Sequence, residues 1–332
     1  MRWHLPPEWH PQEWLWIGFP YDEGEWSGTL SGAQEQLAAF ANAVSASGQA
    51  VRLVVRDAEN EARARSLVSA SVTLERAEYG DIWLRDTGPL VLADGDGGRQ
   101  ARRFGFNGWG GKFPMAGDAT IGAELAGNAG LKVLTADWIL EGGAIDVDGN
   151  GLAVTTQQCL LNPNRNPTLT REDVEARLMR DLGLNRVLWL GNGLVNDHTD
   201  GHVDNLARFV APGVLAVPAA SGPDDPNAAL YADARDRASA FGLEVRAVPS
   251  PGRIEREGRI EPASYMNFAI TTNCVVVPTF GSVQDKAGVA AIAALFPDRD
   301  TIGLRADAVL AGGGGFHCAS QHMPSAGWPA TR

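Results

Sequence analysis

A run of four glycines, residues 312–315, leads into Phe316, His317 and Cys318 near the end of the sequence. Glycines let a backbone approach a ligand closely and adopt positive φ angles. A free cysteine is usually a small buried hydrophobe, and we favour that interpretation for Cys159 and Cys274, which lie in apolar, strand-like segments. The residues beside Cys318 are polar instead, which favours a nucleophile at this position.

A nucleophilic thiolate needs a neighbouring acid/base. Adjacent residues of an extended chain point to opposite faces, so His317 is poorly placed to serve Cys318. Residues 197–204 read Asp-His-Thr-Asp-Gly-His-Val-Asp and lead into an apolar run. If this segment is extended, His202 and Asp204 share one face and form a histidine–carboxylate team. A polar loop with an isolated histidine would contain the same residues.

Two further acids stand among apolar neighbours. Asp86 follows Asp81-Ile82-Trp83-Leu84-Arg85, which we predict to be a strand ending at a turn, and Glu141 lies between Leu140 and a pair of glycines. Burial of a lone carboxylate is unfavourable unless it is paired. Arg85 could supply a structural partner for Asp86, or both acids could bind a cationic ligand.

The composition limits the class of partner. The chain has 332 residues with 28 Lys and Arg against 40 Asp and Glu, a net charge of −12. This balance argues against nucleic acid, whose phosphates need a basic surface. It suits a small cationic substrate, because an acidic field concentrates cations, although acidity also serves solubility alone.

The cysteines and the apolar runs of the chain indicate its cellular compartment and argue against metal sites. Three cysteines, an odd number and without ligand spacing, predict neither a disulfide framework nor a zinc site. Residues 146–151 imitate half of a calcium loop, but Gln157 replaces the required glutamate, so we predict a hairpin turn. No signal-like or membrane-spanning apolar run is found, so a cytoplasmic protein is expected.

The coarse pattern is α/β. Apolar runs predict strands, and amphipathic runs predict helices between them, as at residues 33–47, where Leu37, Phe40 and Val44 share a face. Thr170 is a predicted N-cap with Asp173 three residues on. No linker divides the chain, so one domain over residues 1–332 is predicted. The predicted strands are Ala50–Val55, Ile82–Leu84, Leu152–Thr155, Leu206–Val210, Val214–Val217 and Cys274–Pro278, and the other helices Glu172–Leu182, Ala228–Phe241 and Gly288–Leu295.

Seven segments together resemble the agmatine deiminase family of the guanidine-modifying (pentein) superfamily. They appear in order across almost the whole chain. The segments are GDIWLRDTGP (80–89), FNGWGGKF (106–113), LEGG (140–143), TTQQCLLNPNRNP (155–167), TDGHVDN (199–205), ASYMNFAI (263–270) and GGGGFHCASQ (312–321).

The resemblance implies a pentein fold, a five-bladed α/β-propeller of ββαβ modules around a central channel. Cys318 matches the nucleophile, His202 the general acid/base and Glu141 the carboxylate that orients this histidine. Asp86 and Asp204 match the pair that binds the guanidinium nitrogens, an arrangement suited to a planar cation.

The implied activity is hydrolysis of agmatine, a step toward putrescine, to N-carbamoylputrescine and ammonia through a Cys318 thiouronium, without metal or organic cofactor. Candidates for binding the rest of this small cation include Trp83, Trp109 and Asp200, along with Asp22 and Glu25. The resemblance involves no membrane and allows a homo-oligomer.

The match to the family weakens at two places. Gly315 stands where the family usually has Asn, and residues 20–27 keep only Pro20 and Trp26 of a family segment. Two alternatives therefore stay open: a deiminase whose substrate is another guanidine, such as free or peptidyl arginine, and an enzyme that transfers the amidino group to an amine. So does a non-catalytic pentein that binds a ligand, whereas a papain-like protease lacks its local cysteine signature.

Overall fold

One arrangement of strands recurs in four sheets of the computed structural model, which describes residues 3–26 and 28–327. In each, two antiparallel strands are followed by a helical crossover to a third strand, parallel to the second. The strands are β4 (Leu90–Ala93), β5 (Arg99–Gly105) and β6 (Lys132–Ile139); β7 (Ile145–Val147), β8 (Leu152–Thr156) and β9 (Arg186–Leu190); β10 (Arg208–Ala211), β11 (Val214–Ala219) and β12 (Glu244–Pro249); and β15 (Ala269–Ile270), β16 (Cys274–Thr279) and β17 (Asp300–Arg305).

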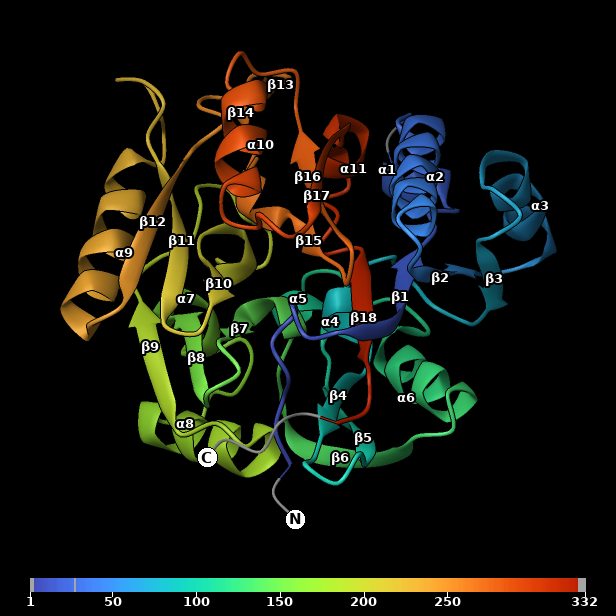
Figure 1. The fold of residues 1–332 in the computed structure, drawn as a ribbon, viewed down its shortest axis with the longest axis horizontal. Coiled ribbons are helices and arrows are strands. Elements are labelled where there is room, and N and C mark those ends of the chain that lie inside the picture. Colours follow the sequence, from blue (N-terminus) through green and yellow to red (C-terminus); the bar gives the residue numbers. More distant parts are fainter. Residues whose placement is uncertain (1–2, 27, 328–332) are drawn as a thin grey trace.

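The crossovers carry the longer helices, which lie toward the rim of the view in Figure 1, whereas α4 and α5 lie near its middle. A parallel connection requires such a crossover, because a tight turn can only join antiparallel strands. The crossover helices are α5 (Gly108–Gly111) and α6 (Asp118–Asn128), α7 (Gln157–Leu160) and α8 (Arg171–Leu182), α9 (Ala228–Phe241), and α10 (Asp285–Ala293).

A fifth sheet joins the two ends of the chain. Strand β18 (Ser320–Pro324) pairs antiparallel with β1 (Gln12–Gly18), and β1 is parallel to β2 (Ala50–Val55). Figure 1 shows the blue and red strands side by side. The pairing brings Cys318 beside the N-terminal segment. The sheet continues to β3 (Thr73–Arg76), with α1 (Glu23–Trp26), α2 (Leu30–Ala46) and α3 (Ala58–Leu67) in the connections.

Short helical segments fill the loops between the sheets and carry most of the residues predicted to do chemistry. Helix α4 holds Asp86, a 3-10 turn follows Glu141, and another follows His202. These elements are α4 (Leu84–Thr87), η1 (Gly142–Ala144), η2 (Val203–Asn205), η3 (Tyr265–Asn267) and α11 (Asp307–Ala311); a hairpin of β13 (Glu255–Arg256) and β14 (Arg259–Ile260) also occurs.

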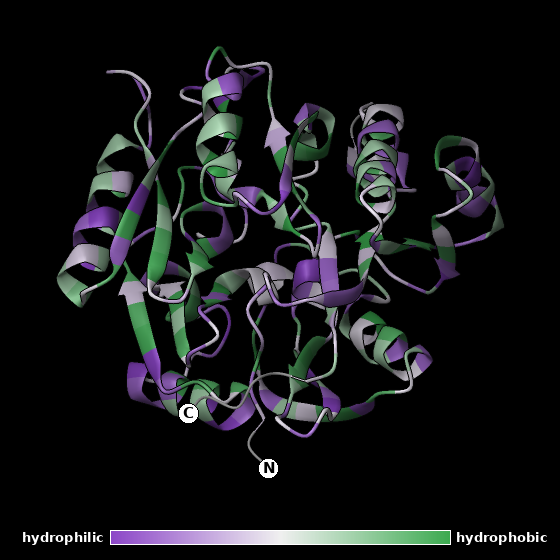
Figure 2. Cartoon of the chain, in the orientation of Figure 1, coloured by the Kyte–Doolittle hydropathy of each residue, from purple (hydrophilic) through white to green (hydrophobic). Residues whose placement is uncertain are grey.

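The inner strands are the most apolar part of the fold. Every residue of β8 and of β16 is buried, and β11 is largely green in Figure 2 while the sheet-edge strand β12 has a purple stretch. Strands covered on both faces need continuous apolar runs, which these sequences supply. None of the helices in the described residues has the length and apolar character of a membrane crossing.

Most predicted elements are confirmed. The strands at residues 50–55, 152–155, 214–217 and 274–278 and the four helices form within a few residues of the predicted limits. Thr170 caps α8 in a reciprocal capping box with Asp173. Residues 148–151 form a hairpin turn, in which the Asp148 carboxylate accepts the N–H groups of Asn150 and Leu152.

Two local predictions were wrong, and one predicted strand forms but begins two residues late. Residues 82–84 are not a strand, because Leu84 begins α4. The strand predicted at Leu206 begins at Arg208, and Val203–Asn205 form a 3-10 turn rather than an extended chain. Backbone turns are favoured here because Trp83 and Val203 carbonyl oxygens accept N–H groups three to four residues later. The predicted shared face of His202 and Asp204 therefore has no basis in strand geometry.

The left-handed glycine after α8 provides a test of how the N-terminal segment packs. Gly183 has φ +72°, and a Cβ there would lie 2.1 Å from the Trp3 carbonyl oxygen; Gly242, after α9, has φ +96° and open space around it. We predict that Gly242→Ala costs about 1–2 kcal/mol for the left-handed conformation alone. Gly183→Ala should lower the free energy of unfolding by more than this, as measured by urea unfolding. Equal losses would contradict the packing of Trp3 against the end of α8.

Candidate active site

A cavity of about 170 Å³ opens beside Cys318. Its wall combines aromatic rings with carboxylates and glycine backbone, and among the residues that the structure describes neither lysine nor arginine lines it. Its lining residues are Glu25, Trp26, Asp81, Trp83, Asp86, Trp109, Phe113, His198, Thr199, Ala311, Gly312, Gly313, Gly314 and Cys318.

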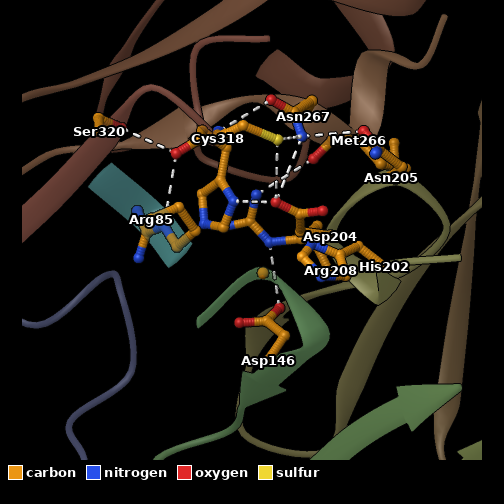
Figure 3. A network of polar contacts seen from close by, with 12 residues as sticks. Arg85, Asp146, His202, Asp204, Asn205, Arg208, Met266, Asn267, Cys318 and Ser320 are labelled. Carbon is orange, nitrogen blue, oxygen red and sulfur yellow. Dashed lines mark hydrogen bonds and ion pairs between the residues drawn. The ribbon is translucent and has the colours of Figure 1, made fainter. Parts of the chain in front are cut away.

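The Cys318 thiol is almost wholly buried at the inner end of this cavity. Its sulfur lies 3.0 Å from Nδ2 of Asn267 and 3.4 Å from Oδ2 of Asp204, as Figure 3 shows. Oδ1 of the same asparagine accepts the Cys318 N–H at 3.2 Å. One amide side chain thus holds both the backbone and the sulfur of the nucleophile.

Asp204 is held by a histidine that the sequence analysis had set aside. Nδ1 of His317 lies 2.7 Å from Oδ2 of Asp204, and Nε2 lies 2.8 Å from Oε2 of Glu8. His317 therefore contacts the carboxylate that touches the Cys318 sulfur. Burial raises the pKa of Asp204, but the hydrogen bond and charge of His317 outweigh it and hold this pKa below its usual value.

Two buried arginines balance these carboxylates. Arg208 pairs with Glu8 and with Asp146, and it donates to the Phe268 carbonyl at 2.7 Å. Arg85 lies 3.8 Å from Glu8. Burial raises the pKa of Glu8, but His317, Arg208 and Arg85 together hold it well below the usual value. Burying these charges is tolerable because each has a partner.

Asp86 faces the cavity from helix α4. Its Oδ2 accepts the Trp109 indole N–H at 2.9 Å, and its Oδ1 accepts the Gly143 N–H at 2.9 Å. Burial raises its pKa, the charge of His202 opposes this rise, and Asp204 adds to it. Asp86 and Asp204 thus stand near each other, since Gly143 lies within reach of both.

His202 is fully buried behind Asp86, with Nδ1 at 3.6 Å from Oδ1 of Asp86. A nitrogen of its ring, a carboxylate oxygen of Glu141 and the Cys159 sulfur all lie within 4.8 Å of one another. Burial lowers the pKa of His202, but Asp86, Cys159 and Glu141 outweigh it and hold the pKa well above the usual value. These neighbours therefore favour the imidazolium form of His202.

The surroundings of Cys318 favour its uncharged form, whereas those of His202 favour the charged form. Burial, and then the charges of Asp204 and Asp86, raise the pKa of its thiol well above the usual value. With the cavity free of a cation, the thiol keeps its proton at neutral pH. A cation bound between the two carboxylates would offset their charge and favour the thiolate.

The structure brings Cys318, His202, Glu141, Asp86 and Asp204 together, as the resemblance implies. Trp83 and Trp109 line the cavity. Asp200 is not among the lining residues. Its carboxylate pairs with Lys112 and Arg165 and accepts from Asn164 at 2.9 Å, and Arg165 in turn donates to Glu141 at 2.9 Å.

Several neighbours of the site were missed from sequence. Glu8 and Arg208 carry no local signal, because their partners lie far along the chain. Asn267 stood in a segment already noted for its resemblance, so its amide could have been found. Cys159 was interpreted as a buried apolar residue; it is buried, but it also lies against His202.

The departure at Gly315 has a steric explanation in this chain. A Cβ at this position would lie 2.6 Å from Oδ1 of Asn267, the atom that accepts the Cys318 N–H. Of residues 20–27, Glu25 and Trp26 line the cavity, while Ser27 lies outside the described residues.

Comparison with solved structures defines the class. The structure entitled agmatine deiminase of Enterococcus faecalis catalyzing its reaction matches with a TM-score of 0.92 and 30% identity, over 97% of this chain and 96% of that one. The structure entitled DDAH from Pseudomonas aeruginosa complexed with citrulline shares the fold, at a TM-score of 0.53 and 14% identity over 94% and 100% of the two chains. The fold is the α/β pentein fold.

The family follows from the sequence. Residues 4–324 match the family described as Porphyromonas-type peptidyl-arginine deiminase. A relative from Marinomonas sp. (strain MWYL1), provisionally named agmatine deiminase, is 34% identical over 96% of this chain and 94% of its own length. The chain belongs to the Porphyromonas-type peptidyl-arginine deiminase family.

The position of Gly143 predicts that the site tolerates almost no added volume. A Cβ there would lie 2.6 Å from Nδ1 of His202, 2.8 Å from Oδ1 of Asp86 and 3.1 Å from Oδ2 of Asp204. Gly143→Ala should lower kcat/KM for deimination by about 100-fold, because small displacements of reacting groups are costly. Ammonia release is the measurement. Gly127→Ala, with open space around it, is the control, and a fully active Gly143→Ala enzyme would contradict this geometry.

The raised pKa of the Cys318 thiol predicts slow alkylation of the free enzyme at neutral pH. Because only the thiolate reacts, the rate with iodoacetamide should rise about tenfold per pH unit from pH 7 to pH 9. Asp86→Asn removes a negative charge, lowers the thiol pKa and should speed the reaction at pH 7. Mass spectrometry locates the label.

Asp300→Asn, an exposed change in β17, is the matched control for this charge effect. A rate that does not change between pH 7 and pH 9 would mean that Cys318 is already a thiolate in the free enzyme, contrary to the electrostatics above.

Proposed function

We propose that this protein hydrolyses agmatine to N-carbamoylputrescine and ammonia. The observation that carries the proposal is the cavity wall, whose described residues include the carboxyl groups of Glu25 and Asp81 and neither lysine nor arginine. Such a wall suits a substrate whose far end is a cation, and its described residues offer no lysine or arginine to an α-carboxylate. A decarboxylated arginine fits this charge pattern better than arginine does.

We assign the guanidinium to Asp86 and Asp204, with its carbon beside the Cys318 sulfur. Trp109 and Gly143 orient Asp86 through hydrogen bonds. Two carboxylates localise the positive charge and hold the group for attack. Trp83, whose indole N–H donates to Asp81 at 2.8 Å, supplies an aromatic wall for the aliphatic chain.

The reaction then proceeds in two halves. When the guanidinium binds, Cys318 releases its thiol proton to solvent; the thiolate then bonds to the guanidinium carbon, and protonated His202 gives its proton to the departing nitrogen, which leaves as ammonia. In the second half, His202 takes a proton from water, whose oxygen attacks the thiouronium carbon. The carbon–sulfur bond breaks and releases the ureido product. The raised pKa of His202 supplies the acid for the first half.

Glu141 supports this histidine electrostatically, and Arg165 fixes the Glu141 carboxylate. Asp200 joins Lys112 and Arg165 outside the cavity lining. We assign it to positioning Arg165 rather than to contact with the substrate.

The same proposal includes the architecture and setting of the enzyme. The recurring strand arrangement supports five blades in one domain spanning the chain, with the β18–β1 pair completing the first blade. The net charge of −12 supports a small cation rather than nucleic acid as partner. Three free cysteines among the described residues support the cytoplasm as its compartment.

Kinetics on a panel of guanidines tests the substrate. We predict that agmatine gives the highest kcat/KM, with free arginine and a peptidyl arginine far lower, measured as ammonia and ureido product. Turnover of another guanidine without turnover of agmatine would overturn the assignment. Amidino transfer would appear as product that forms only when an amine acceptor is added.

Glu25→Gln tests recognition of the far end. Because Glu25 is exposed, loss of its charge should raise KM for agmatine only about two- to fivefold. Glu23→Gln, on the same helix but outside the cavity lining, is the control.

Cys318→Ala should abolish turnover, and retained activity would exclude the covalent route.

A further inference from the structure

The Cys159 thiol forms no bond in the reaction proposed above, but it lies against His202, the residue assigned as acid and base. The thiol comes from helix α7 and is fully buried. Its sulfur, a ring nitrogen of His202 and an oxygen of Glu141 lie within 4.8 Å of one another. A thiol, an imidazole and a carboxylate are the three side chains from which proteins build zinc sites.

The second observation is that, within the part of the chain that the structure describes, polar atoms of Glu141 and His202 lack conventional hydrogen bonds, although Nδ1 of His202 lies 3.6 Å from Oδ1 of Asp86. Among residues 3–26 and 28–327, neither Nδ1 nor Nε2 of His202 has a hydrogen bond of good geometry, and Oε2 of Glu141 has none. Both side chains are fully buried. Buried polar atoms without partners are rare and call for an explanation.

Arg165 leaves the carboxylate open on one side. Its guanidinium donates to Oε1 of Glu141 at 2.9 Å, while Oε2 stays without a hydrogen bond among the described residues. Arg165 also donates to the Thr199 carbonyl at 2.7 Å. Metal-binding carboxylates are themselves held by such neighbours, so the pair is compatible with Oε2 as a ligand.

The distances suit a small thiophilic cation. Zinc bonds of about 2.0–2.3 Å place neighbouring ligand atoms about 3.4 Å apart. From separations of at most 4.8 Å, the three side chains would need to approach by only about 1 Å. Hard cations such as Mg²⁺ prefer all-oxygen sites, so the ligand set selects zinc or cadmium.

We propose that Glu141, Cys159 and His202 form a binding site for a thiophilic divalent cation of the Zn²⁺ class, and that the bound cation inhibits the enzyme. Binding occupies a nitrogen of His202 and so blocks its proton transfers. The inhibition part rests on the proposed function, whereas the site itself does not. The acidic cavity in front of Asp86 gives cations a favourable approach.

Cadmium absorption tests the site without any activity assay. The measurement is the ultraviolet charge-transfer band of a cadmium–thiolate bond, titrated at pH 8 because thiol and imidazole bind metals after losing their protons. All variants carry Cys318→Ala, so the nucleophile cannot contribute. The band should appear in this background and disappear when Cys159→Ala is added.

Cys274→Ser is the matched control, since Cys274 is equally buried but lies in β16 beside Thr271. It should leave the band unchanged. Glu141→Gln should weaken cadmium binding at least about tenfold, which covers the case in which Cys159→Ala does not fold. A band that persists without Cys159, or no band in the Cys318→Ala background, would overturn the site.

Inhibition is measured separately on the enzyme with Cys318 present. Zn²⁺ should reduce ammonia release, EDTA should restore it, and Cys159→Ala should raise the half-inhibitory concentration at least tenfold. An unchanged value in Cys159→Ala would overturn the inhibitory role. If no guanidine is turned over but the cadmium band follows Cys159, the proposed function fails and the metal site stands.

Discussion

The arrangement of the whole site depends on one carboxylate, Asp204, kept ionised where water cannot reach it. Its Oδ2 accepts from His317 and contacts the Cys318 sulfur. An isolated buried carboxylate would take up a proton, and a neutral Asp204 could neither bind a guanidinium strongly nor restrain the thiol. His317 prevents this, and Glu8 supports His317 from the other side. The chemistry therefore depends on residues that never meet the substrate.

Because of the same charges, formation of the Cys318 thiolate depends on a bound cation. Asp204 and Asp86 disfavour the Cys318 thiolate while the cavity holds no cation, and they attract the cation that reverses this effect. His202 is held in its protonated form by the same neighbourhood. Substrate binding and activation of the sulfur are thus one electrostatic event, which protects the thiol from reagents that carry no positive charge.

The sequence marked the residues that we assign to the reaction more clearly than it predicted the elements that hold them, and their separate roles came from the resemblance to a family. Cys318, His202, Glu141, Asp86 and Asp204 were found because their types stand out in apolar or glycine-rich surroundings. The elements around them were harder to predict, because α4 and the 3-10 turn after His202 are too short for periodicity to show.

The residues that support the site from behind could not be predicted from local sequence patterns. Glu8 and His317 are 309 residues apart, so no spacing rule connects them. Arg208 begins an ordinary-looking strand, and only the folded chain shows it against Glu8 and Asp146. The glycine pair at residues 142–143 was noted from sequence, but nothing in it indicated that a Cβ at Gly143 would meet the side chains of His202, Asp86 and Asp204.

The antiparallel pairing of β18 with β1 also has a consequence for how the enzyme is made. Glu8 and β1 leave the ribosome well before His317, Cys318 and β18, since Glu8 and His317 are 309 residues apart. Until then Asp204 lacks the imidazole that keeps it charged, and the N-terminal strand lacks its neighbour. Such long-range contacts form slowly, so the growing chain acquires its other sheets before it acquires a reactive centre. The reactive centre is therefore assembled only after both of these distant segments have been made.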